Sequence, residues 1–267
     1  MGADIKSLRT RIKSVDSTLH LTKAMGLVAS SKIRRATDAM NKSREYSRAI
    51  DGLLSSLTRS PECERSPYMK KREGTRTKII IIAGDRGLAG GYNANIFRLA
   101  RTLPECEFIP IGKRACDKFA GQKLFAEKFS CEDANALARK LCREFAQGEF
   151  DRLGIISTKY VSMMTQEPVL SWVLPLERKE SEGAESIIFE PDELTILECA
   201  VIEYVTGVLV GAVRESFASE VAARRCAMDS AGKNAQEMID TLQLEYNRAR
   251  QSAITQEITE IVAGSGA

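Results

Sequence analysis

Apolar and small residues recur at alternating spacings of three and four through the first forty positions of the chain. On a helix this spacing forms one continuous stripe, the pattern of a coiled-coil seam. The stripe consists of Ile5, Leu8, Ile12, Val15, Leu19, Thr22, Gly26, Ala29, Ile33, Ala36 and Met40. Its members are large at the start and small around Gly26 and Ala29, where two helix backbones can approach closely. We therefore expect a long N-terminal helix that needs a partner along its length.

A second, less regular stripe lies near the other end of the chain. It consists of Ala231, Ala235, Met238, Leu242, Ala249 and Ala253. Three isoleucines repeat the pattern on an adjoining face: Ile254, Ile258 and Ile261. Asp192 and Thr195 are candidate N-terminal caps for this helix, and Gly264 and Gly266 mark its end. The two stripes together predict an antiparallel coiled coil formed by the two ends of the chain.

The seven prolines divide the chain into three segments. All of them lie between Pro61 and Pro191. Because proline breaks helix interiors at a cost of about 3 kcal/mol or more, long helices are excluded from the middle but not from the arms. We expect an N-terminal helix over 1–60, a central domain over 61–191 and a C-terminal helix over 192–267.

Charge favours pairing of the two arms. Residues 1–60 hold twelve Lys/Arg against five Asp/Glu, a balance of +7, and residues 192–267 hold six against twelve, a balance of −6. Each arm alone repels itself, whereas the pair nearly cancels. The alternative is that these are two solvated faces on separate helices.

The middle segment has the pattern of a small α/β domain. Residues 78–83 form a continuous apolar run that fits a buried parallel strand, and 108–111 and 153–157 are further candidate strands. The helical patterns between them cover 93–103, 113–121 and 133–146, and 169–174 is a candidate edge strand. This alternation predicts a Rossmann-like parallel sheet inserted between the two arms.

A glycine-rich turn follows the strongest predicted strand, at residues 83–93 (AGDRGLAGGYN). A doubly wound fold binds phosphate at this position. The glycine spacing matches neither the dinucleotide nor the P-loop motif. Two interpretations remain, a tight turn that packs a helix against the sheet and a nucleotide site.

Little else in the chain points to catalysis. The only histidine, His20, lies beside the predicted seam, and the seven cysteines form no C-x-x-C pair. A reactive Ser, Cys or carboxylate needs a partnered base. We therefore expect no catalytic residue, metal or cofactor.

The overall composition narrows the compartment and the partners. The net charge of +3 gives no sign of nucleic-acid binding. Scattered cysteines indicate reduced thiols. The sequence shows neither a signal peptide nor an apolar stretch long enough for a membrane span.

Four segments resemble the gamma subunit of F-type ATP synthases, in that family's order. They are residues 21–32 (LTKAMGLVASSK), the glycine turn at 85–93, residues 219–235 and the tail at 244–262 (LEYNRARQSAITQEITEIV). The tail is the most specific of these, and the glycine turn alone is weak. The matches span both ends and the middle of the chain.

The resemblance implies a rotor. In this family the two arms form the coiled coil that enters a ring of alternating alpha and beta subunits. The globular domain lies near the epsilon subunit and the membrane c-ring. Proton flow turns the shaft, and the catalytic sites belong to the stator. The chain is then a non-catalytic subunit attached to the cytoplasmic side of a bacterial plasma membrane only through the complex.

The resemblance also implies which residues meet the stator. Arg250, Gln251, Thr255 and Glu257 are expected near the top of the shaft. Lys23 and Met25 are expected in the region that touches the moving beta-subunit loop. These six positions are the candidate rotor–stator contacts.

Four positions depart from the family pattern. Gly26 replaces a larger, usually charged residue, Gly232 stands where Thr or Ser is usual, and Arg225-Cys226 replaces a more apolar pair. Two other functions remain as alternatives to the rotor: a nucleotide-binding enzyme built on the central domain, and a structural coiled-coil adaptor. Co-purification with alpha and beta subunits and nucleotide calorimetry distinguish them.

Overall fold

The computed structural model of the chain describes residues 2–72, 74–120, 124–178 and 189–265. It divides into two compact units. The hairpin unit consists of Met1–Ser30 and Arg224–Ala267, and the sheet unit consists of Ser31–Ala223. Two long helices, α1 (Gly2–Leu57) and α5 (Glu193–Ser265), contribute residues to both units.

The sheet unit is built on four strands in the order β2-β1-β3-β4. They are β1 (Thr77–Ile82), β2 (Glu107–Ile111), β3 (Arg152–Tyr160) and β4 (Gln166–Leu174). β1 pairs in parallel with β2 and β3, and β4 pairs antiparallel with β3. The strand prolines, Pro110 and Pro168, lie on the two edge strands, where a missing N–H is tolerated. The predicted sheet is confirmed, with β4 as an antiparallel edge.

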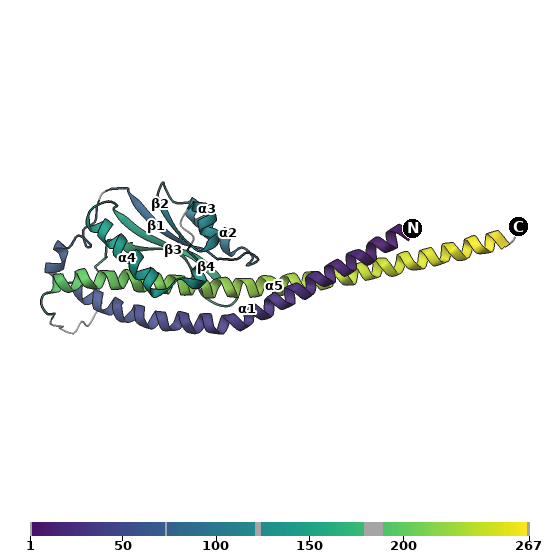
Figure 1. Cartoon of the computed structure of the whole chain (residues 1–267), viewed down its shortest axis with the longest axis horizontal. Helices are drawn as coiled ribbons and strands as arrows, with labels where there is room; N and C mark the ends of the chain where they lie inside the picture. Colours follow the sequence, from purple (N-terminus) through teal and green to yellow (C-terminus); the bar gives the residue numbers. More distant parts are fainter. Residues whose placement is uncertain (1, 73, 121–123, 179–188, 266–267) are drawn as a thin grey trace. The chain divides into compact units, whose positions relative to one another are not determined.

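Helices cover both faces of this sheet (Figure 1). The short ones are α2 (Tyr92–Arg101), α3 (Lys113–Phe119) and α4 (Cys131–Ala146), with 3₁₀ turns at η1 (Pro61–Arg65) and η2 (Ala126–Lys128). Ile80, Ile82 and Ile155 face a core shared with α4 and α5. The alternate residues Ile79, Ile81 and Ile156 face a second core with α2 and α3. The period-two alternation of side chains along a strand explains why the β1 isoleucines divide between two cores.

The first half of α5 is a core helix. It includes an 18-residue window with a mean hydropathy of 1.9, apolar enough by composition to cross a membrane, of which 44% is buried. Leu197, Val201, Val205, Leu209 and Val213, spaced four apart, all belong to the core shared with the sheet. The apolarity of this window is therefore explained by packing within the sheet unit.

In the hairpin unit α1 and α5 run antiparallel. A Cβ atom added at Gly26 would lie 3.7 Å from Met228 Cβ, and one added at Gly232 would lie 3.6 Å from Thr22 Oγ1 and 3.9 Å from Leu19 Cδ1. Residue numbers thus fall on α1 as they rise on α5. The antiparallel coiled coil is confirmed.

The predicted α1 seam is confirmed along both units, since all eleven of its residues are buried or half-buried. One α5 position is wrong. Met238 is 45% exposed, and Ile239 is the half-buried residue of that turn. Ala235, Ile239, Leu242, Tyr246 and Ala249 are buried or half-buried and alternate at spacings of four and three. The seam of α5 therefore keeps its 3.5-residue repeat and passes through Ile239 instead of its apolar neighbour Met238.

Candidate functional site

Asp85, in the glycine turn after β1, binds backbone groups of two neighbouring segments. Asp85 Oδ1 accepts hydrogen bonds from the backbone N–H groups of Lys113 and Ala126, both at 3.0 Å. Asp85 Oδ2 accepts from Glu127 N at 2.8 Å. Convergent backbone N–H groups at this end of a doubly wound sheet are what a phosphate would bind. The internal carboxylate takes those donors, which favours the tight-turn interpretation over a nucleotide site.

The rest of the turn is also held by its own residues. Asn93 Oδ1 accepts from Gly84 N at 2.9 Å, and Asn93 Nδ2 donates to Arg86 O at 3.4 Å. A Cβ atom at Gly84 would lie 2.7 Å from the carboxylate carbon of Glu220, so only glycine fits there without displacing α5's side chain. The turn is a packing element that brings the sheet close to α5.

A charged cluster joins this turn to α1. Lys32 Nζ lies 2.5 Å from Glu127 Oε1, and Arg86 Nη2 lies 3.8 Å from Glu127 Oε2. The opposite net charges of the two arms predicted that basic residues of α1 pair with the acidic C-terminal arm. The structure places Lys32 against the central domain instead, because η2 brings Glu127 to the surface of α1.

The only histidine of the chain, His20, is an exposed residue of α1. His20 has a side chain 75% exposed and lies 3.8 Å from Asp16 on the same helix. Across the described part of the chain, no group of three His, Cys, Asp or Glu residues could hold a metal ion. His20 is therefore interpreted as a solvent-exposed residue on the surface of α1.

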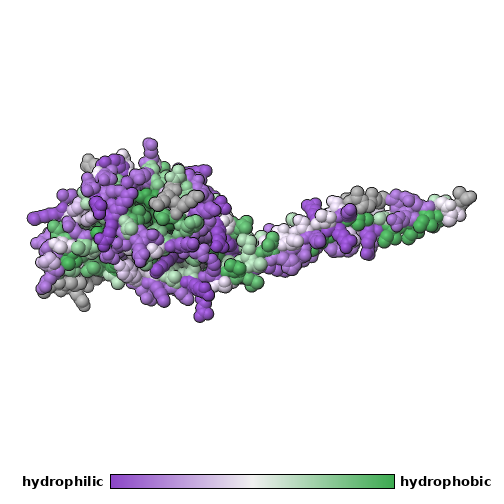
Figure 2. Space-filling view, in the orientation of Figure 1, coloured by the Kyte–Doolittle hydropathy of each residue, from purple (hydrophilic) through white to green (hydrophobic). Residues whose placement is uncertain are grey.

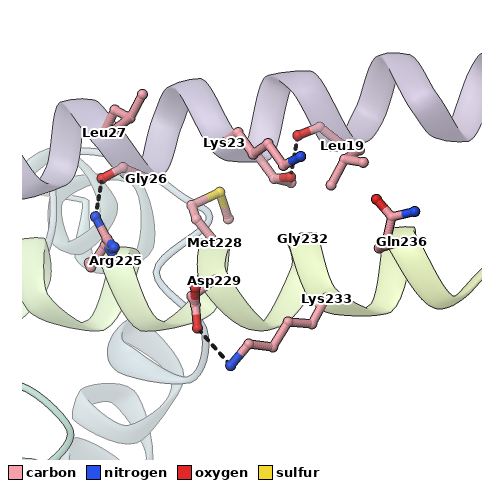
Figure 3. A pocket seen from close by; sticks show the side chains of 11 residues that line it. Leu19, Lys23, Gly26, Leu27, Arg225, Met228, Asp229, Gly232, Lys233 and Gln236 are labelled. Carbon is pink, nitrogen blue, oxygen red and sulfur yellow. Dashed lines mark hydrogen bonds and ion pairs between the residues drawn. The ribbon is translucent and has the colours of Figure 1, made fainter.

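Lys23 lines a groove in the hairpin unit, whose volume is about 500 Å³. The groove opens where Gly26 and Gly232 leave out side chains, and Figure 3 shows Met228 pointing toward α1 beside Gly26. Arg225 Nη1 reaches across to Gly26 O at 3.3 Å and also bonds Ser30 Oγ. The departures at Gly26, Gly232 and Arg225 therefore meet at one place.

The two candidate contacts on α1 are placed differently. Lys23 is exposed, whereas Met25 is half-buried. Lys23 thus presents its charge at the rim of the groove, and Met25 lies partly within the helix pair.

The other four candidate contacts lie on the last turns of α5, and all are exposed. Arg250 and Glu257 are seven residues apart and share one face of the helix. Gln251 and Thr255 are neighbours, since Thr255 Oγ1 donates to Gln251 O at 2.9 Å. The sequence-predicted residues thus form two adjacent polar rows rather than one cluster.

An exposed apolar row runs beside these polar residues. Its members are Ile254, Ile258, Ile261 and Val262, exposed by 45%, 55%, 70% and 64%. Figure 2 shows the hydrophobic residues gathered on one side of this end of the chain. The contacts of Gly26 with Met228 and of Gly232 with Thr22 set the register of the two antiparallel helices. The same register places Gly2 of α1 opposite about residue 252 of α5. The α5 residues beyond that point therefore extend past the start of α1, and their apolar row is uncovered.

One cluster was missed by the sequence, at the contact of α5 with the end of β3. We call it the polar junction and define it as Arg44, Tyr92, Thr158, Tyr160, Glu215, Ser216 and Ser219. On their own helix Glu215, Ser216 and Ser219 look like ordinary surface residues. Only the placement of β3 beside α5 reveals their partners.

Comparison with known proteins finds matches to ATP synthase proteins over nearly the whole chain. The ATP synthase family model matches residues 4–267. An ATP synthase gamma chain of Ruminococcus albus is 40% identical over 281 residues, covering 98% of each chain.

Solved structures share the fold at lower identity. A chain of the Euglena gracilis mitochondrial ATP synthase, in an assembly of OSCP, F1 and c-ring, matches with a TM-score of 0.69 at 18% identity, covering 100% of this chain and 95% of that one. A chain of the Euglena gracilis rotor matches with a TM-score of 0.64 at 17% identity, covering 95% and 100%. The arrangement of long paired helices around an inserted sheet, the family match and the full-length relative lead to one conclusion: the chain belongs to the ATP synthase gamma chain family.

Proposed function

We propose that this chain is the central rotor subunit of an F-type ATP synthase. In this role it couples proton translocation through the membrane c-ring to ATP synthesis or hydrolysis at the alpha and beta subunits by rotation. The observation that carries the proposal is the end of α5, an uncovered helix with an apolar row beside exposed polar residues. Such a surface suits a shaft that turns inside an apolar sleeve and catches it at a few polar points.

Five of the six candidate rotor–stator contacts are polar points of this kind, and the sixth, Met25, is apolar. Arg250 and Glu257 supply opposite charges on one face, and charge-assisted hydrogen bonds are stronger than neutral ones. Gln251 and Thr255 supply neutral donors and acceptors beside them. On α1, Lys23 at the rim of the groove and Met25 next to it face the moving loop of the beta subunit.

The chain itself is proposed to be non-catalytic. Asp85 of its glycine turn occupies convergent backbone N–H groups at the starts of α3 and η2, which are donors of the type that would bind a phosphate. Chemistry in the complex then belongs to the sites formed by the alpha and beta subunits. The rotor changes those sites by its asymmetry as it turns.

The partners follow from the same role. They are the alpha and beta subunits, the epsilon subunit and the c-ring, and association with the membrane is indirect, through the complex. Within that complex, the proposed location is the cytoplasmic side of a bacterial plasma membrane.

A truncation in the assembled complex tests the proposal. We expect a chain ending at residue 249 to co-purify with alpha and beta subunits, to leave each beta-subunit site chemically intact, and to lower proton-driven ATP synthesis. The point variants Arg250→Ala and Glu257→Ala should lower it less. Arg101→Ala, at the end of α2 in the sheet unit, is the control.

Two results would contradict the proposal. One is an undiminished proton-driven rate in the truncated complex. The other is a wild-type chain that fails to assemble with alpha and beta subunits, which would favour a coiled-coil adaptor. Calorimetry of the isolated chain with ATP should detect no binding.

A further inference from the structure

β3 is longer than β1, one of the two strands beside it. The β1–β3 pairing ends at Ile81↔Ile156, and β1 itself ends at Ile82, whereas β3 continues to Tyr160. On the β1 side, the backbone groups at the end of β3 therefore have no strand to pair with. Buried backbone groups are almost always paired, so another element must supply the partners.

α5 supplies them with side chains. Ser216 Oγ accepts from Thr158 N at 3.0 Å, and Ser219 Oγ donates to Thr158 O at 3.2 Å. The residue just before Ser216 also takes part, because Glu215 Oε1 accepts from Tyr160 N at 3.1 Å. Three α5 side chains thus continue the hydrogen-bond ladder that β1 leaves unfinished.

Two further elements meet at the same place. Tyr92 of α2 donates its hydroxyl hydrogen to Ser216 O at 2.8 Å. Arg44 of α1 places Nη2 at 2.6 Å from Glu215 Oε1, the same oxygen that Tyr160 N reaches. The polar junction therefore joins α1, α2, α5 and β3 within the sheet unit.

This contact differs in kind from the rest of the α5–sheet contact. Upstream, Val205, Leu209 and Val213 pack into the core, and apolar contact is non-directional. Ser216 and Ser219 are 1% and 0% exposed, so their partners cannot be replaced by water. Turning α5 by one residue, about 100°, would leave these buried groups unpaired, which is strongly unfavourable.

We propose that the polar junction is a rotational lock, which prevents α5 from turning about its own axis against the sheet when the rotor carries load. Glu215, Ser216 and Ser219 are its positioning residues, and they act on the reaction only through the helix that they hold. The proposal rests on the proposed function, because a chain that carries no torque has no use for such a lock.

The test uses the assembled complex. The alpha/beta ring is fixed to a surface and a bead is attached to the exposed face of α2, so that the angular variance of the stalled rotor reports its torsional stiffness. The lock variant is Ser216→Ala/Ser219→Ala, and Glu215→Gln keeps an acceptor oxygen while it removes the charge paired with Arg44. Ser230→Ala and Glu198→Gln, at exposed positions of α5, are the matched controls.

The lock variant removes two of the three α5 side-chain bonds to β3, so we expect the angular variance to rise about twofold. The ratio of proton-driven synthesis to ATP hydrolysis should fall with it. Glu215→Gln should show a smaller rise, and the controls none. A lock variant that assembles and fluctuates like the wild type overturns the proposal. If the double variant does not assemble, Ser219→Ala alone decides by the same two outcomes.

The two proposals fail in different ways. If the wild-type chain does not join alpha and beta subunits or does not rotate with them, the proposed function is wrong. If the wild type rotates and the variants are equally stiff, only the rotational lock is wrong.

Discussion

Asp85 shows how one side chain determines what a loop is able to bind. The turn around it has the place and composition of a phosphate loop, yet its carboxylate accepts three backbone N–H groups from two other segments. The same residue therefore organises the start of α3 and of η2. Its contribution should appear in stability rather than in ligand binding.

We expect Asp85→Ala to lower the free energy of unfolding by about 2–4 kcal/mol. The substitution removes three hydrogen bonds to a charged group and leaves the three backbone N–H donors without this acceptor. Chemical denaturation of the full chain measures this. Asp117→Ala, on the exposed side of α3, is the control. An Asp85→Ala chain as stable as the wild type would show that the three bonds contribute nothing.

Substitution of two glycines by alanine compares a crowded position, Gly84, with an open one, Gly52. Gly84→Ala should cost about 1–3 kcal/mol, because the new methyl group overpacks the site against Glu220, whose carboxylate carbon would lie 2.7 Å away. Gly52→Ala, near the C-terminal end of α1 with nothing within 4 Å of the added methyl group, should stabilise by about 0.5–1 kcal/mol. Thermal unfolding of both variants measures the difference, and equal effects would contradict the close approach at Gly84.

At the scale of single elements, α4 begins with a reciprocal cap. Ser130 Oγ accepts from Asp133 N at 3.0 Å, and Asp133 Oδ2 accepts from Ser130 N at 3.0 Å. The backbone N–H of Ser130, followed by its hydroxyl group, lowers the pKa of Asp133 below its ordinary value of 3.8. A folded-state pKa below the unfolded one means that the stabilisation is present above the ordinary pKa and is lost as the pH falls through the folded one.

We therefore expect the unfolding free energy of the wild type to decrease between about pH 5 and pH 2 more steeply than that of Asp133→Asn. Acid titrations of both chains, followed by circular dichroism, measure the two slopes. Ser130→Ala should remove the cap at a cost of about 1 kcal/mol. Identical slopes for wild type and Asp133→Asn would exclude the carboxylate from the cap.

Local patterns predicted the elements well. The α1 seam follows from spacing alone, since a helix fixes which residues share a face, and the β1 strand follows from its unbroken isoleucine run. Met238 was misplaced because Met238 and Ile239 are both apolar and a seam can step by three or by four residues, so spacing alone does not choose between them. The partner of Lys32 and the polar junction depend on residues far apart in the chain, which no local pattern contains.

At the scale of the whole molecule, thiol chemistry offers a direct check of the burial pattern. Cys131 and Cys199 are exposed. Burial raises the pKa of Cys63 to about 11 and that of Cys142 to about 12. Since the thiolate is the nucleophile, buried thiols with raised pKa values react slowly.

We expect brief treatment with iodoacetamide at about pH 8 to alkylate Cys131 and Cys199 first, and Cys63 and Cys142 only after unfolding. Peptide mass spectrometry identifies the labelled positions, and labelling in urea is the control that should reach all seven cysteines. Rapid labelling of Cys142 in the native chain would contradict the packing of α4 on the sheet.

The pairing of α1 with α5 has a consequence for synthesis on the ribosome. Arg225 binds α1 at Gly26 and Ser30, 199 and 195 positions earlier in the chain. The apolar stripe of a nascent α1 therefore stays exposed to solvent until the C-terminal part of the chain has been translated. During this delay an apolar surface that is prone to aggregation is accessible to other chains. We therefore expect a chaperone that binds exposed apolar helices to act on this protein during translation.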